Sequence, residues 1–414
     1  MKETGFINMK TETMPEVLAP AGNLTALYTA VDYGADAVYV GGQEFGMRAA
    51  PDNFTMEQLA SGVQYAHTRR VPVYLTLNTL PRNDEVDRLP DFIRQAAQAG
   101  VDAFIVTDPG VLALVKRCAP DCQLHISVQA GIVNYAAARF YHDLGASRIV
   151  VARELSIEEI AEIRAKTPAT LEIEAFVHGA MCMSVSGRCL LSEYLTGRDA
   201  NRGDCAQPCR WEYALVEQTR PGQYMPIVQD DRGSYILNAR DLCMIDHLDK
   251  LYTAGVTSFK IEGRAKTAYY VAAVTYAYKQ AVKLLRGGGE YRLPAQIRDE
   301  VEKISHRAYS TGFYFGRQDA VQEYASSGYI RPYEWIAVVE DYQDGIATVT
   351  QRNRFYPGTY DVLDPVRGSF KIVVDQLYDQ DMQPIECARH AAQIVRFRSE
   401  PLRRGAFIRA RKSE

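Results

Sequence analysis

Eight short apolar runs recur between Glu16 and Leu285, and this strand-then-helix rhythm constrains the fold more than any other feature of the chain. The runs cover residues 17–19, 37–40, 73–77, 103–106, 124–128, 148–151, 171–177 and 258–261. Helical patterns lie between them, for example at residues 23–33, 55–69, 86–99 and 156–166. Several of the helical stretches end at a glycine, which adopts the left-handed backbone that closes a helix: Gly34, Gly100, Gly145 and Gly255. Eight such units in roughly 270 residues predict an α/β fold, a TIM-like (β/α)₈ barrel. An open, doubly wound sheet is the alternative.

The seventh unit carries a long insertion. A cysteine-rich segment, residues 180–236, separates the strand that ends at Val177 from the next helical pattern, near residues 241–253. In a barrel, the loop after a strand lies at the C-terminal face, where TIM barrels build their active sites. We therefore expect this insertion to lie beside the active site.

The pattern changes after Leu285. The run Arg286-Gly287-Gly288-Gly289 predicts a flexible break, and a short helix is expected at residues 296–306. Alternating strands then follow at residues 335–339, 346–351, 360–363, 371–376, 393–397 and 406–410, and Asp344-Gly345 is a strong hairpin signal. The expected domains are a flexible N-terminus (1–14), the barrel (15–285), a linker with a helix (286–332) and a small C-terminal β-barrel (333–414).

Composition excludes some classes of protein. Hydrophobic residues make up 47% and charged residues 24%, a globular balance that excludes a mostly disordered chain. The net charge is −4, so contact with nucleic acid would need a local patch. Residues 396–414 offer one, with seven Lys and Arg against two Glu, although a solvated tail has the same composition. No run of 18 apolar residues and no signal-peptide pattern occurs, so we expect a cytoplasmic protein without membrane contact.

Five of the eight cysteines gather within 62 residues. They are Cys182, Cys189, Cys205, Cys209 and Cys243. Thiolates bind soft metals, and four of them suffice for an iron–sulfur cluster or a closed zinc site. Zinc usually takes closely paired cysteines, and only Cys205 and Cys209 are paired in this way, so the spacing favours an iron–sulfur cluster. Inert, buried thiols are the alternative.

Titratable residues end the seventh and eighth strands. Alternation along the seventh strand places Glu174 and His178 on one face, which we expect to point into the barrel mouth and to allow proton transfer. A buried structural pair is the alternative. Lys260, Glu262 and Arg264 close the eighth strand, where a barrel also places function, although Lys260 and Glu262 could pair with each other.

The insertion also contains an arginine-rich loop. Arginine binds phosphate or carboxylate through two parallel hydrogen bonds. Arg198, Arg202 and Arg210 are therefore candidates for contact with an anionic ligand, and a plain surface loop is the alternative.

Several long motifs occur in order and resemble those of peptidase family U32, the collagenase-like proteins. They are Leu18–Asn23 with Ala37–Gly42, Glu174–Cys189, Asn201–Arg210 and Lys260–Arg264, and the resemblance runs from near Pro15 to near Gly316. Residues His306–Tyr314 and the C-terminal β-domain are similar to the subgroup implicated in 5-hydroxylation of the wobble uridine of tRNA.

This resemblance implies a [4Fe–4S] cluster held by Cys182, Cys189, Cys205 and Cys243, with Cys209 as an alternative ligand. Purification in air would leave zinc or an empty site in its place. The resemblance also implies tRNA as a partner, prephenate as a co-substrate, and a homo-oligomer or a hetero-oligomer with a paralogue. Glu174, His178 and the segment Lys260–Arg264 would line the pocket, and the three loop arginines would meet phosphate or a carboxylate-bearing donor.

Three functions follow as predictions. The first is an iron–sulfur enzyme that modifies tRNA. The second is a peptidase of unassigned catalytic type, because the family is named for peptidases, although the chain has no His-Glu-x-x-His or Gly-x-Ser-x-Gly motif. The third is a non-catalytic subunit of a hetero-oligomer, in which the cysteines are purely structural.

Overall fold

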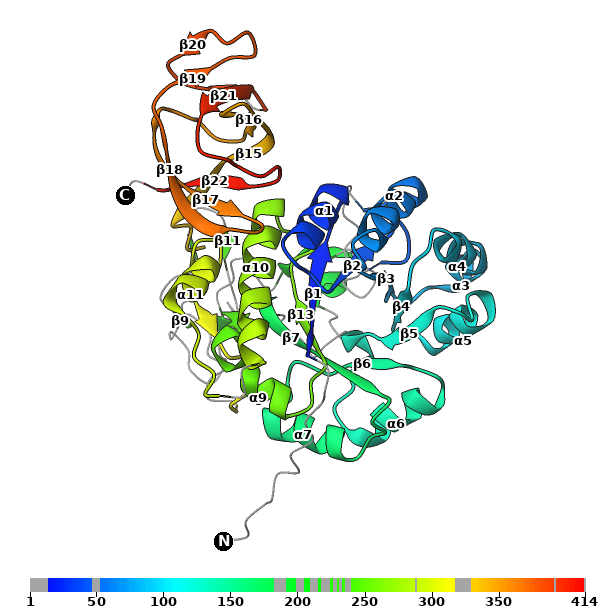
Figure 1. Cartoon of the computed structure of the whole chain (residues 1–414). Coiled ribbons are helices and arrows are strands. Elements are labelled where there is room, and N and C mark those ends of the chain that lie inside the picture. The colour runs from blue at the N-terminus through cyan, green and yellow to red at the C-terminus, as the bar shows by residue number, and fades with distance from the viewer. Residues whose placement is uncertain are drawn as a thin grey trace.

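Eight parallel strands close into a barrel in the computed structural model of the chain (Figure 1). The structure describes residues 14–46, 53–181, 191–198, 205–208, 215–216, 224–225, 229–230, 233–234, 240–286, 289–316, 329–390 and 392–412. The barrel strands are β1 (Glu16–Ala21), β2 (Ala37–Gly41), β3 (Val73–Leu77), β4 (Ala103–Val106), β5 (Gln123–Ile126), β6 (Arg148–Val150), β7 (Glu172–Ala180) and β13 (Ser258–Ile261). β13 pairs with both β1 and β7, which closes the cylinder. The predicted barrel is therefore confirmed, and the open sheet is excluded.

Helices cover the outside of the barrel (Figure 1). They are α1 (Leu24–Asp32), α2 (Met56–His67), α3 (Asn83–Val86), α4 (Leu89–Gln98), α5 (Pro109–Cys118), η1 (Val128–Ala130), α6 (Tyr135–Asp143), α7 (Ile157–Ala165), η4 (Ile245–His247), α9 (Leu248–Thr253), α10 (Ala268–Leu285) and α11 (Ala295–Glu302). Among the described residues, six α-helices begin at a side chain that accepts a hydrogen bond from the first turn: Asn23, Thr55, Asp108, Asn134, Ser156 and Thr267. The four predicted glycine stops have positive φ angles between 88° and 96°. These local signals fix the boundaries of the βα units.

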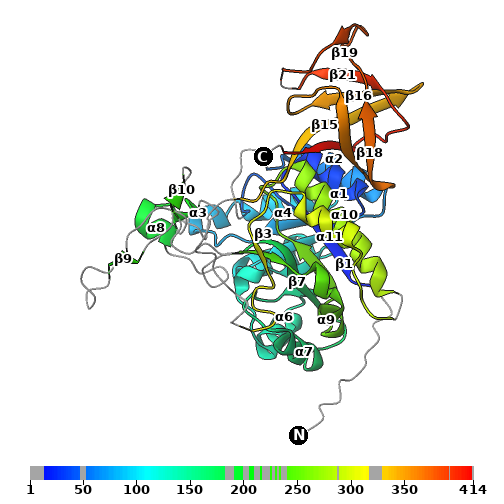
Figure 2. The same cartoon turned by 90° about the vertical axis from the view of Figure 1, so that its left-hand side faces the viewer.

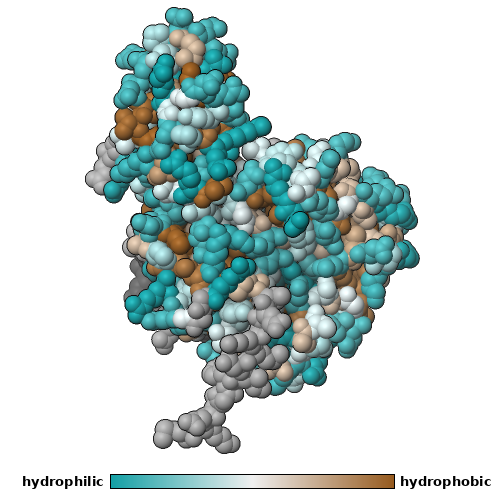
Figure 3. Space-filling model, viewed as in Figure 1, coloured by the Kyte–Doolittle hydropathy of each residue, from teal (hydrophilic) through white to brown (hydrophobic). Residues whose placement is uncertain are grey.

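The surface of the protein on the face seen in Figure 3 is mainly hydrophilic, with hydrophobic patches scattered over both parts of the molecule. Among the described residues, no helix combines the length and the apolar character that a bilayer crossing requires.

The insertion after β7 returns to the barrel through a short strand. Its described elements are α8 (Leu191–Thr196), β8 (Leu215–Val216), β9 (Tyr224–Met225), β10 (Gln229–Asp230), β11 (Gly233–Ser234) and β12 (Asp241–Cys243), and Figure 2 shows α8, β9 and β10 projecting to one side of the barrel. β12 runs antiparallel to the end of β7, with Asp241 opposite Ala180, and it pairs on its other edge with β14 (Tyr309–Ser310). The sequence pattern predicted a helix near residues 241–253. The strand β12 stands in place of its first turn, because pairing with β7 and β14 overrides local preference.

The C-terminal β-domain is an antiparallel sheet of eight strands with an apolar core of its own. Its strands are β15 (Tyr333–Gln343), β16 (Ile346–Gln351), β17 (Gly358–Asp364), β18 (Gly368–Val374), β19 (Leu377–Tyr378), β20 (Pro384–Ile385), β21 (Ile394–Arg398) and β22 (Phe407–Arg411). Asp344 and Gly345 both have positive φ, 50° and 82°, as the predicted two-residue hairpin requires. The separate C-terminal β-domain is thus present, while the exact domain boundaries stay a prediction.

A seam of buried polar contacts joins this sheet to the barrel. The hydroxyl of Tyr33, at the end of α1, lies 2.7 Å from the carbonyl oxygen of Leu363 and 3.0 Å from that of Gly405. Further along, the buried guanidinium of Arg409 on β22 contacts both carboxylate oxygens of Glu300 on α11, at 2.7 and 2.8 Å. Figure 1 shows the sheet beside α1, α10 and α11. Arg409 belongs to the basic C-terminal segment, yet it serves the domain contact rather than the surface.

Candidate active site at the barrel mouth

Charged side chains from four neighbouring strands form a chain inside the barrel. Arg148 on β6 contacts Glu16 on β1 at 2.7 Å, and on β7 it contacts Glu172 at 2.7 Å and Glu174 at 3.1 Å. Glu174 in turn accepts a hydrogen bond of 2.7 Å from the ammonium of Lys260 on β13. Burial would raise the pKa of Glu174, but Lys260 and Arg148 outweigh burial and hold that pKa below its usual value. Glu174 is therefore a carboxylate that is fully buried and bound by two cations.

Lys260 forms the upper end of this chain. Its ammonium lies 4.5 Å from the centre of the Tyr39 ring and 5.6 Å from that of Phe176, and the side chain is almost fully buried. Aromatic faces attract a cation, so the two rings hold the ammonium toward the mouth. Glu174 lies deeper, because its register partner Ser258 precedes Lys260 by two residues on β13. The structure thus places Lys260, rather than Glu174, next to the mouth.

Arg153 and Glu262 lie above Lys260 at the C-terminal ends of the strands. The guanidinium of Arg153 stacks on Phe176, 3.8 Å from the ring centre, and donates to the carbonyl oxygen of Ala180 at 2.8 Å. It also pairs with the carboxylate of Glu262 at 3.2 Å. The suggestion that Lys260 and Glu262 pair with each other is not what the structure shows, because each has a different ion-pair partner.

Arg264 reaches across the mouth from the loop after β13. Its guanidinium donates to the hydroxyl of Thr76 on β3 at 3.2 Å. The path is open because Gly41 lies beneath it: a Cβ atom there would stand 1.9 Å from a guanidinium nitrogen of Arg264. The mouth therefore presents two arginines, Arg153 beside Glu262 and Arg264 beside Thr76, with Lys260 below them.

His178 does not lie with these residues. Its ring lies among Tyr270 and Tyr278 on α10 and Tyr309 on β14, outside the barrel wall, and a ring nitrogen lies 3.3 Å from the hydroxyl of Tyr278. The expectation that simple alternation places His178 with Glu174 is wrong. The register between β7 and β13 shifts at Ile261, so that Val177 is skipped and His178 turns outward. Burial lowers the pKa of His178 to about 3, and the positive charges of Arg298 and Lys266 act in the same direction.

The predicted metal ligands are only partly described. Cys182, Cys189 and the alternative ligand Cys209 lie outside the described residues. Cys205 is exposed, and Cys243 is buried on β12 opposite His178. Within the described residues, no group of three or more His, Cys, Asp and Glu side chains is arranged to hold a metal ion.

Of the three arginines predicted in the insertion, the structure describes only one. Arg198 is exposed just after α8, whereas Arg202 and Arg210 lie outside the described residues. Sequence analysis missed Arg153, although a signal was present. It follows the sixth strand by three residues, at the barrel face where function is usually built.

Comparison with known proteins gives matches over most of the chain. The model of the family described as "Peptidase family U32" matches residues 22–323, and that of the "Peptidase family U32 C-terminal domain" matches residues 331–409. A protein of Bacillus subtilis named for tRNA hydroxylation is 36% identical, over 93% of this chain and 92% of that protein. A protein of Methanocaldococcus jannaschii named as an uncharacterized protease is 43% identical, over 73% of each chain. A 23S rRNA 5-hydroxycytidine synthase of Escherichia coli is 36% identical, over 76% of this chain and 47% of that protein.

Proposed function

Because the chain belongs to peptidase family U32, we propose that it is an RNA-modifying enzyme that adds a hydroxyl group to carbon 5 of the wobble uridine of tRNA. The observation that carries this proposal is the relative from Bacillus subtilis, which is named for tRNA hydroxylation and matches both the barrel and the C-terminal domain. The relative that hydroxylates a cytidine of 23S rRNA supports the same chemistry on a second pyrimidine.

The barrel mouth suits an anionic ligand. Arg153 and Arg264 bring two guanidinium groups to one end of the barrel, beside the carboxylate of Glu262, while the ammonium of Lys260 below them is paired with Glu174. Arginine binds carboxylate and phosphate through parallel hydrogen bonds. We therefore assign to this mouth a phosphate of the RNA or the carboxylates of prephenate as co-substrate. Arg198, Arg202 and Arg210 remain candidates for the other of these two anions.

The described cysteines fit a thiolate-bound cluster. The backbone N–H of Gln207 donates to the sulfur of Cys205 at 3.4 Å, and the backbone N–H of Ile245 is directed at the sulfur of Cys243. In both cases the donor is two residues after the cysteine. Hydrogen bonds to sulfur stabilise thiolate ligands and tune the cluster that they hold. Burial raises the pKa of the Cys243 thiol to about 11, so this side chain would need a bound metal to become a thiolate at neutral pH.

The pairing of β12 with β7 also favours convergence of the sulfurs. β12 holds Cys243 opposite His178, four residues before Cys182 in the chain. Ala180, the last residue of β7, faces Asp241, so both ends of the insertion start from one place. Cys182 is two residues beyond Ala180, and two residues span at most about 7 Å.

We propose that Cys182, Cys189, Cys205 and Cys243 hold a [4Fe–4S] cluster, with Cys209 as an alternative fourth ligand. When bound, such a cluster supplies one-electron redox chemistry. The chain itself would bind the anionic substrate at Arg153 and Arg264 and hold the side chain of Lys260 beside Tyr39 and Phe176.

Protein purified without oxygen is expected to contain about four iron and four sulfide per chain and to be brown. Cys205→Ser and Cys243→Ser should each lose most of the iron. Cys118→Ser, on α5 and far along the chain from the insertion, should keep it. The iron and sulfide content of each protein is measured by metal and sulfide analysis, together with iron–sulfur spectroscopy. A colourless protein in which all eight cysteines titrate as free thiols would contradict the cluster.

Arg264→Ala is expected to lower hydroxylation of tRNA by about 10²–10³-fold, the usual cost of removing one preorganised donor from an active site. The substrate is tRNA from a deletion strain, and mass spectrometry of its nucleosides gives the readout. Arg117→Ala, at an exposed arginine of α5, is the control.

Unmodified wobble uridine in both the deletion strain and its parent would remove the proposed substrate. Cleavage of denatured collagen, lost with Arg264→Ala, would favour the peptidase instead. Hydroxylation that requires an added paralogue and survives Cys243→Ser would favour a non-catalytic subunit.

A further inference from the structure

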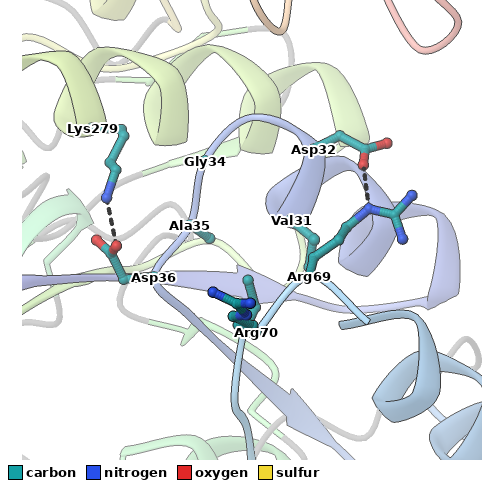
Figure 4. Close-up of a pocket in the computed structure, with 9 residues that line it drawn as sticks. Val31, Asp32, Gly34, Ala35, Asp36, Arg69, Arg70 and Lys279 are labelled. Atoms are coloured by element: carbon teal, nitrogen blue, oxygen red, sulfur yellow. Dashed lines mark hydrogen bonds and ion pairs between the residues drawn. The ribbon is translucent and has the colours of Figure 1, made fainter. Parts of the chain in front are cut away.

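A polar pocket lies at the end of the barrel opposite the mouth. Its volume is about 400 Å³, and it is formed by the turn between α1 and β2, the turn between α2 and β3, and one side chain of α10 (Figure 4). Two ion pairs flank it: Lys279 with Asp36, and Arg69 with Asp32 at 3.5 Å. Figure 4 shows Arg70 between these pairs. Within the part of the chain that the structure describes, no group forms an ion pair or hydrogen bond with the guanidinium of Arg70.

The backbone at Arg70 makes this arginine unusual. Its φ angle is +61°, in the left-handed region that favours glycine. The same position, three residues before a barrel strand, is a glycine with positive φ in four other units: Gly34, Gly100, Gly145 and Gly255. A strained residue with no structural partner is a reason to look for a function. The side chain of Arg70 is exposed, so its guanidinium is available to a ligand outside the chain.

The C-terminal sheet brings a second free arginine to the same seam. The hydroxyl of Tyr33, next to Gly34 of the pocket, lies 3.0 Å from the carbonyl oxygen of Gly405. The residue before Gly405 is Arg404, in the loop between β21 and β22, and it is exposed. Its neighbour Arg403 lies 3.9 Å from the buried carboxylate of Asp364. Arg404 has no such partner among the described residues.

The charges of this seam do not balance. Around the pocket and the loop of Arg404, four carboxylates each face one cation: Asp32, Asp36, Asp364 and Glu400. Further along the seam, Glu300 and Asp361 face Arg409 and Lys303. Arg70 from the barrel and Arg404 from the sheet are left over. Two unpaired guanidinium groups on separate domains suit a ligand with repeated negative charges better than a single small anion, because each group can then take its own phosphate.

We propose that Arg70 and Arg404 bind two backbone phosphates of the RNA substrate, so that the RNA crosses the seam between the barrel and the C-terminal sheet. This inference rests on the proposed function. It names a binding surface that is separate from the barrel mouth and that contacts no base. The two places lie at opposite ends of β2, about 13 Å apart along a strand that rises about 3.3 Å per residue. One folded RNA spans this distance, since domains that bind double-stranded RNA cover about 16 base pairs.

The test compares tRNA binding by full-length wild-type protein, Arg70→Gly, Arg404→Ala and the control Arg117→Ala. Glycine suits the positive φ of residue 70, so Arg70→Gly removes the guanidinium without disturbing the turn. Fluorescence anisotropy with labelled tRNA over a range of salt concentrations gives Kd and its salt dependence. Arg70→Gly and Arg404→Ala should each raise Kd about 5–10-fold near physiological salt. Each should also reduce the slope of log affinity against log salt by about one. Arg117→Ala should match wild type.

The outcomes separate this inference from the proposed function. If wild-type protein binds and hydroxylates tRNA while Arg70→Gly and Arg404→Ala keep the wild-type salt slope, the seam is not an RNA surface and the enzyme assignment stands. If wild-type protein neither binds nor modifies tRNA, both fall. If only Arg404→Ala changes the slope, RNA contact is confined to the sheet and the role of the barrel pocket is overturned.

Discussion

Replacing Arg148 with methionine is expected to lower the free energy of unfolding by about 3–5 kcal/mol, the usual cost of removing one partner from a buried ion pair. Arg148 is almost fully buried and faces the carboxylates of Glu16, Glu172 and Glu174. Methionine fills a similar volume but leaves the buried carboxylate of Glu174 with Lys260 as its remaining ion-pair partner among the described residues. Chemical denaturation followed by circular dichroism measures the loss.

The matched control is Glu172→Gln. Its carboxylate contacts the same guanidinium, but its side chain is 44% exposed, so the expected loss is below about 1 kcal/mol. The deficit of Arg148→Met should also depend on pH. Without Arg148, only Lys260 opposes burial, so the pKa of Glu174 should rise from its lowered wild-type value, and the deficit should shrink as pH falls and Glu174 becomes protonated in both proteins. A loss below about 1 kcal/mol for Arg148→Met at pH 7 would show that the buried ion pairs inside the barrel contribute little stability.

Glu300→Gln is expected to cost a similar amount, about 3–5 kcal/mol, but at the seam between the domains. The carboxylate of Glu300 accepts from Arg409, Ser369 and Lys303, and the guanidinium of Arg409 is fully buried. Burial would raise the pKa of Glu300, yet Arg409 and Lys303 hold it below its usual value. The glutamine would leave Arg409 as a buried cation without a counter-charge.

Hydrogen exchange of β22 gives the readout, because the sheet should lose its anchor on α11 before the barrel unfolds. Glu334→Gln is the control. Glu334 pairs with Lys412 on the same sheet at 3.3 Å, but both side chains are more than 40% exposed, so the change should cost below about 1 kcal/mol. If β22 exchanges at the wild-type rate in Glu300→Gln, the Arg409 contact does not hold the domains together.

The barrel could be predicted from sequence because its signals are local. Each strand packs its outward side chains against helices, so it must be an apolar run, and each of four turns needs a glycine with positive φ. The C-terminal hairpin at Asp344 could be predicted for the same reason, because its signal is also local. The number and order of the eight strands could therefore be predicted from the spacing of the apolar runs and the residues of the turns.

The details that failed depend on contacts between distant residues. The outward turn of His178 follows from a register shift against Ile261, and β12 exists only through pairing with β7 and β14. Charge counting could not show that Arg409 is buried, because its partner Glu300 lies 109 residues earlier. Arg153 could have been found, since its position after the sixth strand was already predicted.

Because β7 and β12 pair with each other, the insertion between them could be replaced without changing the barrel. Ala180 and Asp241 face each other across an antiparallel pair, so a two-residue hairpin could join them and leave the barrel closed. An insertion of different length or sequence can thus be accommodated at this point, while the strands that position the residues of the mouth stay unchanged. A barrel shared by proteins with different substrates is the natural outcome of such an arrangement.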